Sequence, residues 1–255
     1  MAEPAGQGMP LKLGLLIALR REAVGLDQSR LGQLGCSFQI TGPGPEAARA
    51  GARRLLEQGV RLLLSWGSAG ALDDLAPGTV HVPDRVRSAS GVEMFLDASF
   101  SELLAQHFEP IGPVHRGLLF SAAQPIRSAS DKRALRGQTG AVAVDMETHA
   151  IAVEAAARGA AAAALRVIVD AQDMPLPPAA LAALDGPSIR IDRLLASLIR
   201  QPQQIPALVA LARASGRARA GLRACARRMP DLLAGREFGA FQEADRESGV
   251  VERNI

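Results

Sequence analysis

The sequence predicts one α/β domain built on a mostly parallel, mixed sheet. Continuous apolar runs, typical of strands that are buried on both faces, recur along the chain. Segments with helical periodicity lie between these runs, and short connections that carry glycine join the two. This alternation is typical of a layered fold with helices packed against a parallel sheet.

The predicted elements follow in this order. The apolar runs predicted as strands are 11–18, 37–41, 60–66, 78–83, 116–121, 140–144 and 160–169. The segments predicted as helices are 23–34, 46–58, 150–158, 189–198 and 206–228, with a loop and a short helix within 85–108. A glycine-rich loop is expected over 67–72, because small residues let the backbone approach a ligand closely.

Composition indicates a globular protein without a polyanionic partner. The chain has 255 residues, of which 48% are hydrophobic and 22% are charged, enough to bury a full core. Lysine occurs only as Lys12 and Lys132, so arginine carries nearly all of the positive charge. The net charge of +3 is small, and nucleic acid is therefore not predicted as a partner.

The cysteines and the N-terminus indicate a cytoplasmic protein. Cys36 and Cys225 lie far apart without metal-ligand spacing, and we predict buried thiols in a reducing compartment. Residues 1–10 have neither a cationic region nor a long apolar core, and the run 13–19 is too short to span a bilayer. We expect no metal site and no cofactor.

The run from Val144 to Ala152 (V-D-M-E-T-H-A-I-A) is the most informative motif. It places Asp145 and Glu147 where a predicted strand enters a helix, which is where open α/β sheets hold ligand-binding groups. Ionised carboxylates there can accept hydrogen bonds from vicinal hydroxyls. The alternative is that both acids only favour the positive end of the helix dipole.

This run resembles the ribose-binding motif V-E-M-E-x-x-A-I-A of the nucleoside phosphorylase and nucleosidase superfamily. The resembling branch contains methylthioadenosine nucleosidase and futalosine hydrolase, and the resemblance extends over residues 11–199. It implies a three-layer αβα phosphorylase/hydrolase-like fold, commonly a homodimer. It also implies that Asp145, Met146 and Glu147 bind the ribose of a purine nucleoside.

A second resemblance covers the glycine-rich stretch. The run 67–72 (G-S-A-G-A-L), followed by 78–83 (G-T-V-H-V-P), resembles the family patterns T-G-[ST]-A-G-G-L and G-D-V-V-x-P. The resemblance implies that Ser68, Ala69 and Gly70 contact the substrate. Phosphorylases of the hexameric branch carry a phosphate-binding arginine at the position of Ser65, which favours water over phosphate here.

Two further acids match catalytic positions of the family. Glu22 occupies the position of the glutamate that polarises the attacking water; alone it would equally suit a helix first turn. Asp170 occupies the position of the aspartate that protonates the purine at N7, in a segment resembling R-A-[IV]-S-D-x-[AG]-D. Val169 replaces the serine of that pattern, and the alternative is that Asp170 and Asp173 cap a turn. Burial would have to raise the pKa of Asp170 for it to act as an acid.

The loop expected to read the base departs from the family. Residues 121–126 (S-A-A-Q-P-I) stand where the family has S-G-D-x-F-[IV], so Ile126 matches but Pro125 replaces the aromatic residue that stacks on the base. Cleavage of a purine nucleoside is therefore a firmer expectation than adenine specificity.

The resemblance divides the chain into a catalytic domain over 11–200, a basic amphipathic helical extension over 201–229 and a polar tail over 230–255, whose order is doubtful. We predict cleavage of a purine nucleoside with release of adenine. The altered base loop, the run 173–178 (D-M-P-L-P-P) and the arginine-rich helix resemble hopanoid-associated nucleosidases, which are thought to act on lipid-linked adenosylhopane.

Several alternatives stay open. The basic helix would pack on its own domain or lie on an anionic membrane, as a peripheral contact at the inner membrane face. The enzyme alternatives are a phosphorylase and a soluble methylthioadenosine- or futalosine-type nucleosidase. A non-catalytic nucleoside-binding protein is the alternative that Val169 and Pro125 suggest.

Overall fold

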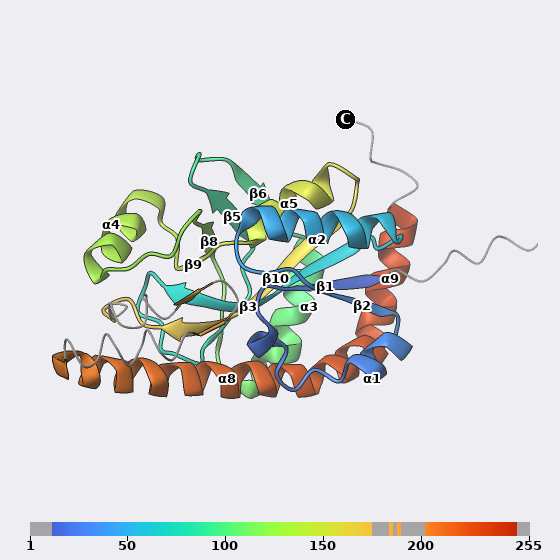
Figure 1. The fold of residues 1–255 in the computed structure, drawn as a ribbon. Helices are drawn as coiled ribbons and strands as arrows, with labels where there is room; N and C mark the ends of the chain where they lie inside the picture. Colours follow the sequence, from blue (N-terminus) through green and yellow to red (C-terminus); the bar gives the residue numbers. More distant parts are fainter. Residues whose placement is uncertain (1–11, 175–183, 186–187, 190–201, 249–255) are drawn as a thin grey trace, which may run out of the picture.

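A ten-stranded mixed sheet forms the middle layer of the molecule (Figure 1). The computed structural model describes residues 12–174, 184–185, 188–189 and 202–248. The strands of the sheet are β1 (Leu13–Ile17), β2 (Cys36–Ile40), β3 (Leu62–Ala71), β4 (Val80–His81), β5 (Arg85–Ser88), β6 (Glu93–Phe95), β7 (Val114–His115), β8 (Leu118–Ser121), β9 (Ala143–Asp145) and β10 (Ala161–Asp170). Two short strands, β11 (Leu184–Asp185) and β12 (Ser188–Ile189), pair with each other apart from this sheet.

Helices cover both faces of the sheet (Figure 1). They are α1 (Gln28–Gln33), α2 (Pro45–Glu57), α3 (Ala98–Phe108), α4 (Ala129–Thr139), α5 (Thr148–Ala156), α8 (Ile205–Ala234) and α9 (Arg236–Ser248). One face carries α2 and α5, which share an apolar core with alternate residues of β1, β3 and β10. The opposite residues of the same strands share a second core with α3, α8 and α9. The predicted three-layer α/β fold is therefore confirmed.

Two long parallel strands, β3 and β10, set the geometry of the sheet. They pair in register from Leu62 with Ala161 to Gly70 with Asp170. The first half of β3 also pairs in parallel with β1, while Gly70 and Ala71 at its other end pair with β9 in antiparallel fashion. This change of neighbour brings the C-terminal ends of β1, β3, β9 and β10 together at one edge.

Close packing of α2 against β1 requires a residue without a side chain. A Cβ atom on Gly14 would lie 2.9 Å from Leu55 Cδ1 and 2.9 Å from Val60 Cγ1, closer than such atoms approach. Gly14 thus lets α2 lie close to the first strand.

Cys36 and Cys225 are buried free thiols, as predicted, and burial raises the pKa of each to about 12.

The observed elements differ from the predicted ones at several places. The stretch expected as a glycine-rich loop, 67–71, continues strand β3, because its backbone pairs with β10. The helix predicted over 23–34 is a 3₁₀ turn, Arg20–Ala23, followed by the short α1, whose N-terminus is capped by Asp27. Helix α4 was not predicted at all. The helix predicted over 189–198 lies outside the described residues.

The C-terminal part is more helical than predicted. Helix α8 does not end near 228 but continues to Ala234, and α9 follows at once, so the expected polar tail is helical as far as Ser248. The aromatic ring of Phe238 packs on Phe100 of α3 with a centroid distance of 5.9 Å, which anchors α9 to the domain. Phe241 of the same helix is partly buried and packs on the same core.

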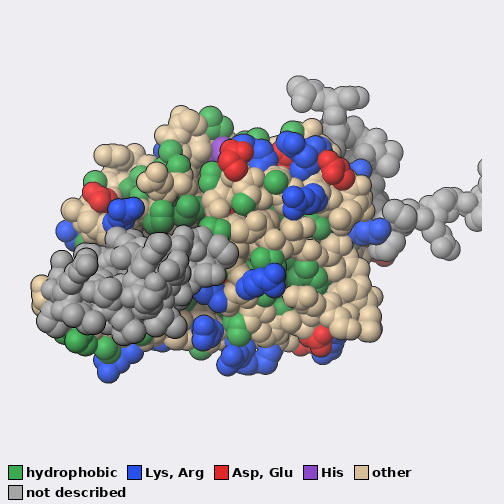
Figure 2. Space-filling view, viewed as in Figure 1, with side chains coloured by type: hydrophobic (Ala, Val, Ile, Leu, Met, Phe, Trp, Pro, Cys, Tyr) green, Lys and Arg blue, Asp and Glu red, His purple; other side chains and the backbone are tan. Residues whose placement is uncertain are grey.

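Helix α8 packs on its own domain through its second half. Its buried stripe consists of Ala214, Ala218, Leu222, Cys225, Ala226, Met229, Leu232 and Leu233. Most arginines of α8 are exposed, whereas Arg228 is partly buried and its Nε donates to the carbonyl oxygen of His107 at 3.3 Å. Figure 2 shows Lys and Arg side chains gathered along the edge that α8 forms. The first half is less covered, with Ile205 and Val209 exposed. No helix in the described part of the chain is long and apolar enough to cross a membrane.

Candidate active site

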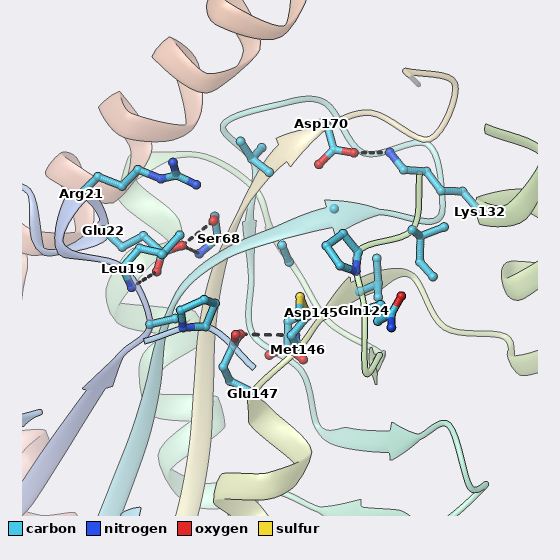
Figure 3. Close-up of a pocket in the computed structure, with 18 residues that line it drawn as sticks. Leu19, Arg21, Glu22, Ser68, Gln124, Lys132, Asp145, Met146, Glu147 and Asp170 are labelled. Atoms are coloured by element: carbon cyan, nitrogen blue, oxygen red, sulfur yellow. Dashed lines mark hydrogen bonds and ion pairs between the residues drawn. The ribbon is translucent and has the colours of Figure 1, made fainter. Parts of the chain in front are cut away.

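A pocket of about 210 Å³ lies where the ends of β1, β3, β9 and β10 meet. Figure 3 shows Glu22 and Ser68 on one side, Asp170 and Lys132 on the other, and Met146 and Glu147 between them. All nine residues predicted to be catalytic or substrate-binding line this pocket: Glu22, Ser68, Ala69, Gly70, Ile126, Asp145, Met146, Glu147 and Asp170. It is also lined by Ala18, Leu19, Arg21, Pro43, Gln124, Pro125, Lys132, Val144 and Val169.

Glu22 is a buried carboxylate held by three donors. The 3₁₀ turn after β1 carries it into the pocket, with only 4% of the residue exposed. Its Oε1 accepts from the backbone nitrogen of Ser68 at 3.0 Å and from Ser68 Oγ at 2.5 Å, while Oε2 accepts from the backbone nitrogen of Leu19 at 3.1 Å. This set of donors fixes the orientation of Glu22, so the carboxylate is preorganised to act on a group beside it.

Gly67 lets two charged side chains lie against strand β3. A Cβ atom on this glycine would lie 2.9 Å from Glu22 Oε2 and 2.7 Å from Arg166 Nη1, closer than such atoms approach. A larger residue at this position would therefore displace Glu22 or Arg166, so Gly67 allows both side chains to approach the backbone of β3.

Glu147 is the acid that faces the middle of the pocket. It precedes α5, and its Oε1 accepts from the backbone nitrogen of Gly44 at 2.8 Å. Gly44 has φ of 95°, a conformation that favours glycine, and it directs this nitrogen at the carboxylate. Burial, and next the negative charge of Asp145, raise the pKa of Glu147 to about 7.

This raised pKa predicts how stability depends on pH. The pKa of this carboxyl is higher in the folded than in the unfolded protein, so the protonated form stabilises the folded state. That contribution to stability is fully present below about pH 4.5 and is lost as the pH rises through about 7. A rise from 4.5 to about 7 corresponds to at most about 3 kcal/mol. Replacing Glu147 by Gln should therefore raise the free energy of unfolding at pH 8 and change it little at pH 4.

Urea denaturation of both proteins at the two pH values measures this difference. The exposed Glu57 on α2 offers a matched control, because Glu57→Gln should leave the pH dependence of the wild type intact. Equal stability of the wild type and Glu147→Gln at pH 8 would show that the carboxyl carries no such cost.

Asp145 lines the pocket, and both oxygens of its carboxylate accept hydrogen bonds from the protein. Its side chain has no exposed surface. It accepts hydrogen bonds from Ser121 Oγ, from the backbone and hydroxyl of Thr148, and from Arg166 Nη2 at 2.5 Å. Because three of these four donors reach Oδ2 and one reaches Oδ1, Asp145 holds Arg166 and the start of α5 in place beneath Glu147.

A β-bulge directs Asp170 into the pocket. The pairing of β10 with β3 slips after Ile168, so Val169 is the extra residue and Asp170 comes opposite Gly70. Bulges of this kind re-aim side chains beside functional sites. Gly70 leaves room for the carboxyl, since a Cβ atom there would lie 3.2 Å from Asp170 Oδ1. Burial raises the pKa of Asp170, and the neighbouring charge of Lys132 opposes that rise.

Lys132 is a residue of this site that sequence reasoning missed. It lies on α4, is 1% exposed, and its Nζ donates to Asp170 Oδ2. The one available signal was that the chain has only two lysines, one of them within the stretch after the base loop. Gln124, Pro125 and Ile126 also line the pocket and form the wall expected to face the base.

The described residues hold no group of three or more His, Cys, Asp or Glu side chains arranged to bind a metal ion. Four acids line the pocket, namely Glu22, Asp145, Glu147 and Asp170, together with the buried cation Lys132, and the buried Arg166 bonds to Asp145. Acids separated in this way suit contacts with a neutral, hydroxyl-rich ligand that also has a group able to take a proton.

Residues 30–199 match the family model described as Phosphorylase superfamily, which is well over half of the chain. The chain belongs to the phosphorylase superfamily. This match confirms the recognition made from the ribose-type motif. No curated protein sequence was found to match the chain.

Solved structures of nucleosidases share this superfamily fold. The 5′-methylthioadenosine/S-adenosylhomocysteine nucleosidase of Neisseria meningitidis, in complex with methylthio-immucillin-A, has a TM-score of 0.62 at 16% identity, over 86% of this chain and 99% of that chain. Futalosine hydrolase of Helicobacter pylori has 0.61 at 18% identity, over 91% and 99%. The methylthioadenosine/S-adenosylhomocysteine nucleosidase of H. pylori has 0.57 at 20% identity, over 65% and 87%. These likenesses establish the fold of this superfamily member.

Proposed function

We propose that this protein hydrolyses the N-glycosidic bond of a purine nucleoside. The observation that carries the proposal is the placement of two buried acids, Glu22 and Asp170, on opposite sides of one pocket, with Glu147 between them (Figure 3). Two carboxyl groups on either side of a breaking glycosidic bond are the arrangement of inverting glycoside hydrolysis. Membership of the phosphorylase superfamily supports a nucleoside as the glycoside.

Glu147 would hold the sugar. Its Oε1 is anchored by Gly44, and its carboxylate faces the pocket, where it can accept hydrogen bonds from the 2′- and 3′-hydroxyls of a ribose. Met146 lines the same wall and would pack against the sugar ring. A ribose held in this way would have C1′ between Glu22 and Asp170.

The reaction needs one proton removed and one supplied. Water beside Glu22 would attack C1′ and lose a proton to Glu22, forming the new C1′–O bond. Asp170, whose pKa is raised by burial, would in its protonated form donate its proton to N7 of the purine as the C1′–N9 bond breaks. The negative charges of Glu22 and Glu147 would stabilise the cationic sugar of the transition state.

Water is favoured over phosphate by the surroundings of Ser65. This residue stands where an arginine would bind phosphate, but its Oγ accepts from Arg166 Nη2 at 2.6 Å and the residue is 1% exposed. A phosphorylase is the second candidate, because Arg21 lines the pocket on the side of Glu22 and could supply a positive charge. The two reactions differ only in the nucleophile.

Chromatographic detection of free base tests the proposal. Purified protein is incubated with adenosine, methylthioadenosine and adenosylhopane in buffer without phosphate. Release of adenine from any of them is the expected result, with the strongest release from the lipid-linked nucleoside. Binding of these nucleosides without any release of base would instead indicate a nucleoside-binding protein.

We further propose that the natural substrate is lipid-linked and that α8 brings the enzyme to a membrane. The exposed arginines of α8 support this proposal, as do Ile205 and Val209, which are 50% and 41% exposed on its first half. A cationic surface with apolar residues beside it suits the surface of an anionic membrane.

Pelleting with liposomes measures this interaction. We expect co-sedimentation with vesicles that contain anionic lipid, reduced several-fold when Arg219 and Arg227 of α8 are both replaced by Gln. The same change at Arg54 and Arg61, which are exposed elsewhere, is the matched control and should have no effect. Equal pelleting of both double variants, or none by the wild type, would contradict membrane delivery.

The homodimer expected from the sequence stays a prediction. The hairpin of β5 and β6 offers an apolar surface for it, with Phe95 80% exposed and Val92 51% exposed. The division of the chain into a catalytic domain over 11–200 and a helical extension is likewise our proposal.

A further inference from the structure

A buried lysine next to the proposed acid has no role in the mechanism described so far. Lys132 is 1% exposed, and the burial of a charged group is costly unless the group is paired and hydrogen-bonded. Its Nζ donates to Asp170 Oδ2, to the carbonyl oxygen of Ala171 at 2.7 Å and to that of Met174 at 3.3 Å. All three hydrogens of the ammonium group are thereby used.

The position of Lys132 in the fold ties two walls of the pocket together. Helix α4 begins after Ser128, whose hydroxyl caps it by accepting from the backbone nitrogen of Asp131 at 3.0 Å. The loop before α4 carries Gln124 and Ile126, which line the wall expected to face the base. Lys132 therefore connects the base-side wall to the end of β10.

We propose that Lys132 is a positioning residue, which orients the carboxyl of Asp170 and sets the pH range over which it can donate a proton to the leaving base. This inference rests on the proposed nucleosidase function. Since the ammonium occupies Oδ2, Oδ1 is the oxygen left for the substrate, and it lies over Gly70, where no side chain intervenes.

Among the described residues, Lys132 is the charged group bonded to Asp170. The residue opposite Asp170 on β3 is Gly70, which carries no charge. From β9 and the start of α5, Asp145 is engaged by Arg166 and Glu147 by Gly44. Burial favours the protonated form of Asp170, and the ammonium favours the ionised form, so their balance sets the acid strength.

Without the ammonium group of Lys132, burial is the remaining influence on the pKa of Asp170. The pKa of Asp170 would then rise further, and the carboxyl would stay protonated to higher pH but would be a weaker acid toward the base. A lysine that merely anchored α4 would have no such effect, because its loss would change stability without changing the pH dependence of catalysis.

The test compares pH profiles of base release for the wild type, Lys132→Gln, Lys132→Arg and Arg133→Met. Gln keeps a donor without the charge, Arg keeps the charge, and Arg133 is an exposed cation on the same helix outside the pocket, so its loss is the matched control. We expect Lys132→Gln to lower kcat on the order of 10²-fold with a smaller change in KM, and to move the alkaline limb of kcat/KM to higher pH. Lys132→Arg should restore part of kcat and return the limb toward that of the wild type.

A folded Lys132→Gln protein with wild-type kcat and an unmoved alkaline limb would overturn the inference. If this variant does not fold, the double variant Lys132→Gln with Asp170→Asn is measured instead. It removes both charges together, so neither is left buried without its partner. Its rate should equal that of Asp170→Asn alone, whereas a further drop of 10²-fold would show that Lys132 acts independently of Asp170. Wild-type protein that releases no base contradicts the proposed function instead, which separates the two failures.

Discussion

Replacing Asp170 by Asn should lower the turnover of a purine nucleoside on the order of 10²- to 10⁴-fold, with little change in nucleoside binding. Asn cannot supply the proton that the leaving base needs, but it preserves the size of the side chain over Gly70. The contacts expected to hold the sugar come from Glu147, on another strand end, and remain in place. Single-turnover base release and equilibrium nucleoside binding are the measurements.

The loss of the carboxylate also leaves Lys132 without its ion-pair partner, which is a source of instability. Circular dichroism therefore has to establish that Asp170→Asn is folded under the assay conditions. Asp173→Asn is the matched control, since Asp173 is exposed on the same connection and does not line the pocket. Unchanged turnover in folded Asp170→Asn would remove Asp170 from the chemistry.

Replacing Glu22 by Gln should lower turnover on the order of 10²-fold or more, again with a small effect on binding. A glutamine cannot take the proton of the attacking water. Both oxygens of Glu22 accept hydrogen bonds from fixed donors, Oε1 from Ser68 and Oε2 from Leu19. The NH₂ group of Gln would replace one of these oxygens and would face a backbone N–H, which is also a donor. The unmatched donor would cost about 1–3 kcal/mol locally.

Steady-state kinetics of base release measures this effect, with the exposed Glu57→Gln as the control for the loss of one acid. Addition of phosphate distinguishes the nucleophiles. A hydrolase should show the same loss at every phosphate concentration. Wild-type kcat in the Glu22→Gln protein would exclude Glu22 as the residue that directs water.

Much of this fold could be predicted because its strands are buried on both faces. The strands β1, β3 and β10 appear in the sequence as mostly apolar runs, broken only by small or single polar residues such as Ser65 in β3 and Arg166 in β10. The run 67–71 was wrongly predicted as a loop, because glycine and alanine resemble a flexible connection unless the pairing with β10 is known. Helix α4 has a mostly polar sequence and buries little besides Lys132, so it lacks a helical apolar stripe.

The parts of the site that could be predicted are acids that follow the end of a predicted strand. Glu22, Glu147 and Asp170 lie in three separate segments, and the structure brings all three to one pocket, as expected. The partners of each acid could not be predicted. Lys132 reaches Asp170 across 38 positions of sequence, and Asp145 accepts hydrogen bonds from Arg166, Thr148 and Ser121. Such contacts depend on how helices are placed in three dimensions.

Identification of the sugar product at saturating phosphate tests the central claim most directly. Wild-type protein is incubated with the nucleoside that it cleaves best, and the products are followed by phosphorus and proton NMR. The structure-based account predicts the free sugar with adenine, and no sugar 1-phosphate, because water beside Glu22 is the nucleophile. Formation of sugar 1-phosphate, with no base released when phosphate is absent, would contradict it and make the protein a phosphorylase.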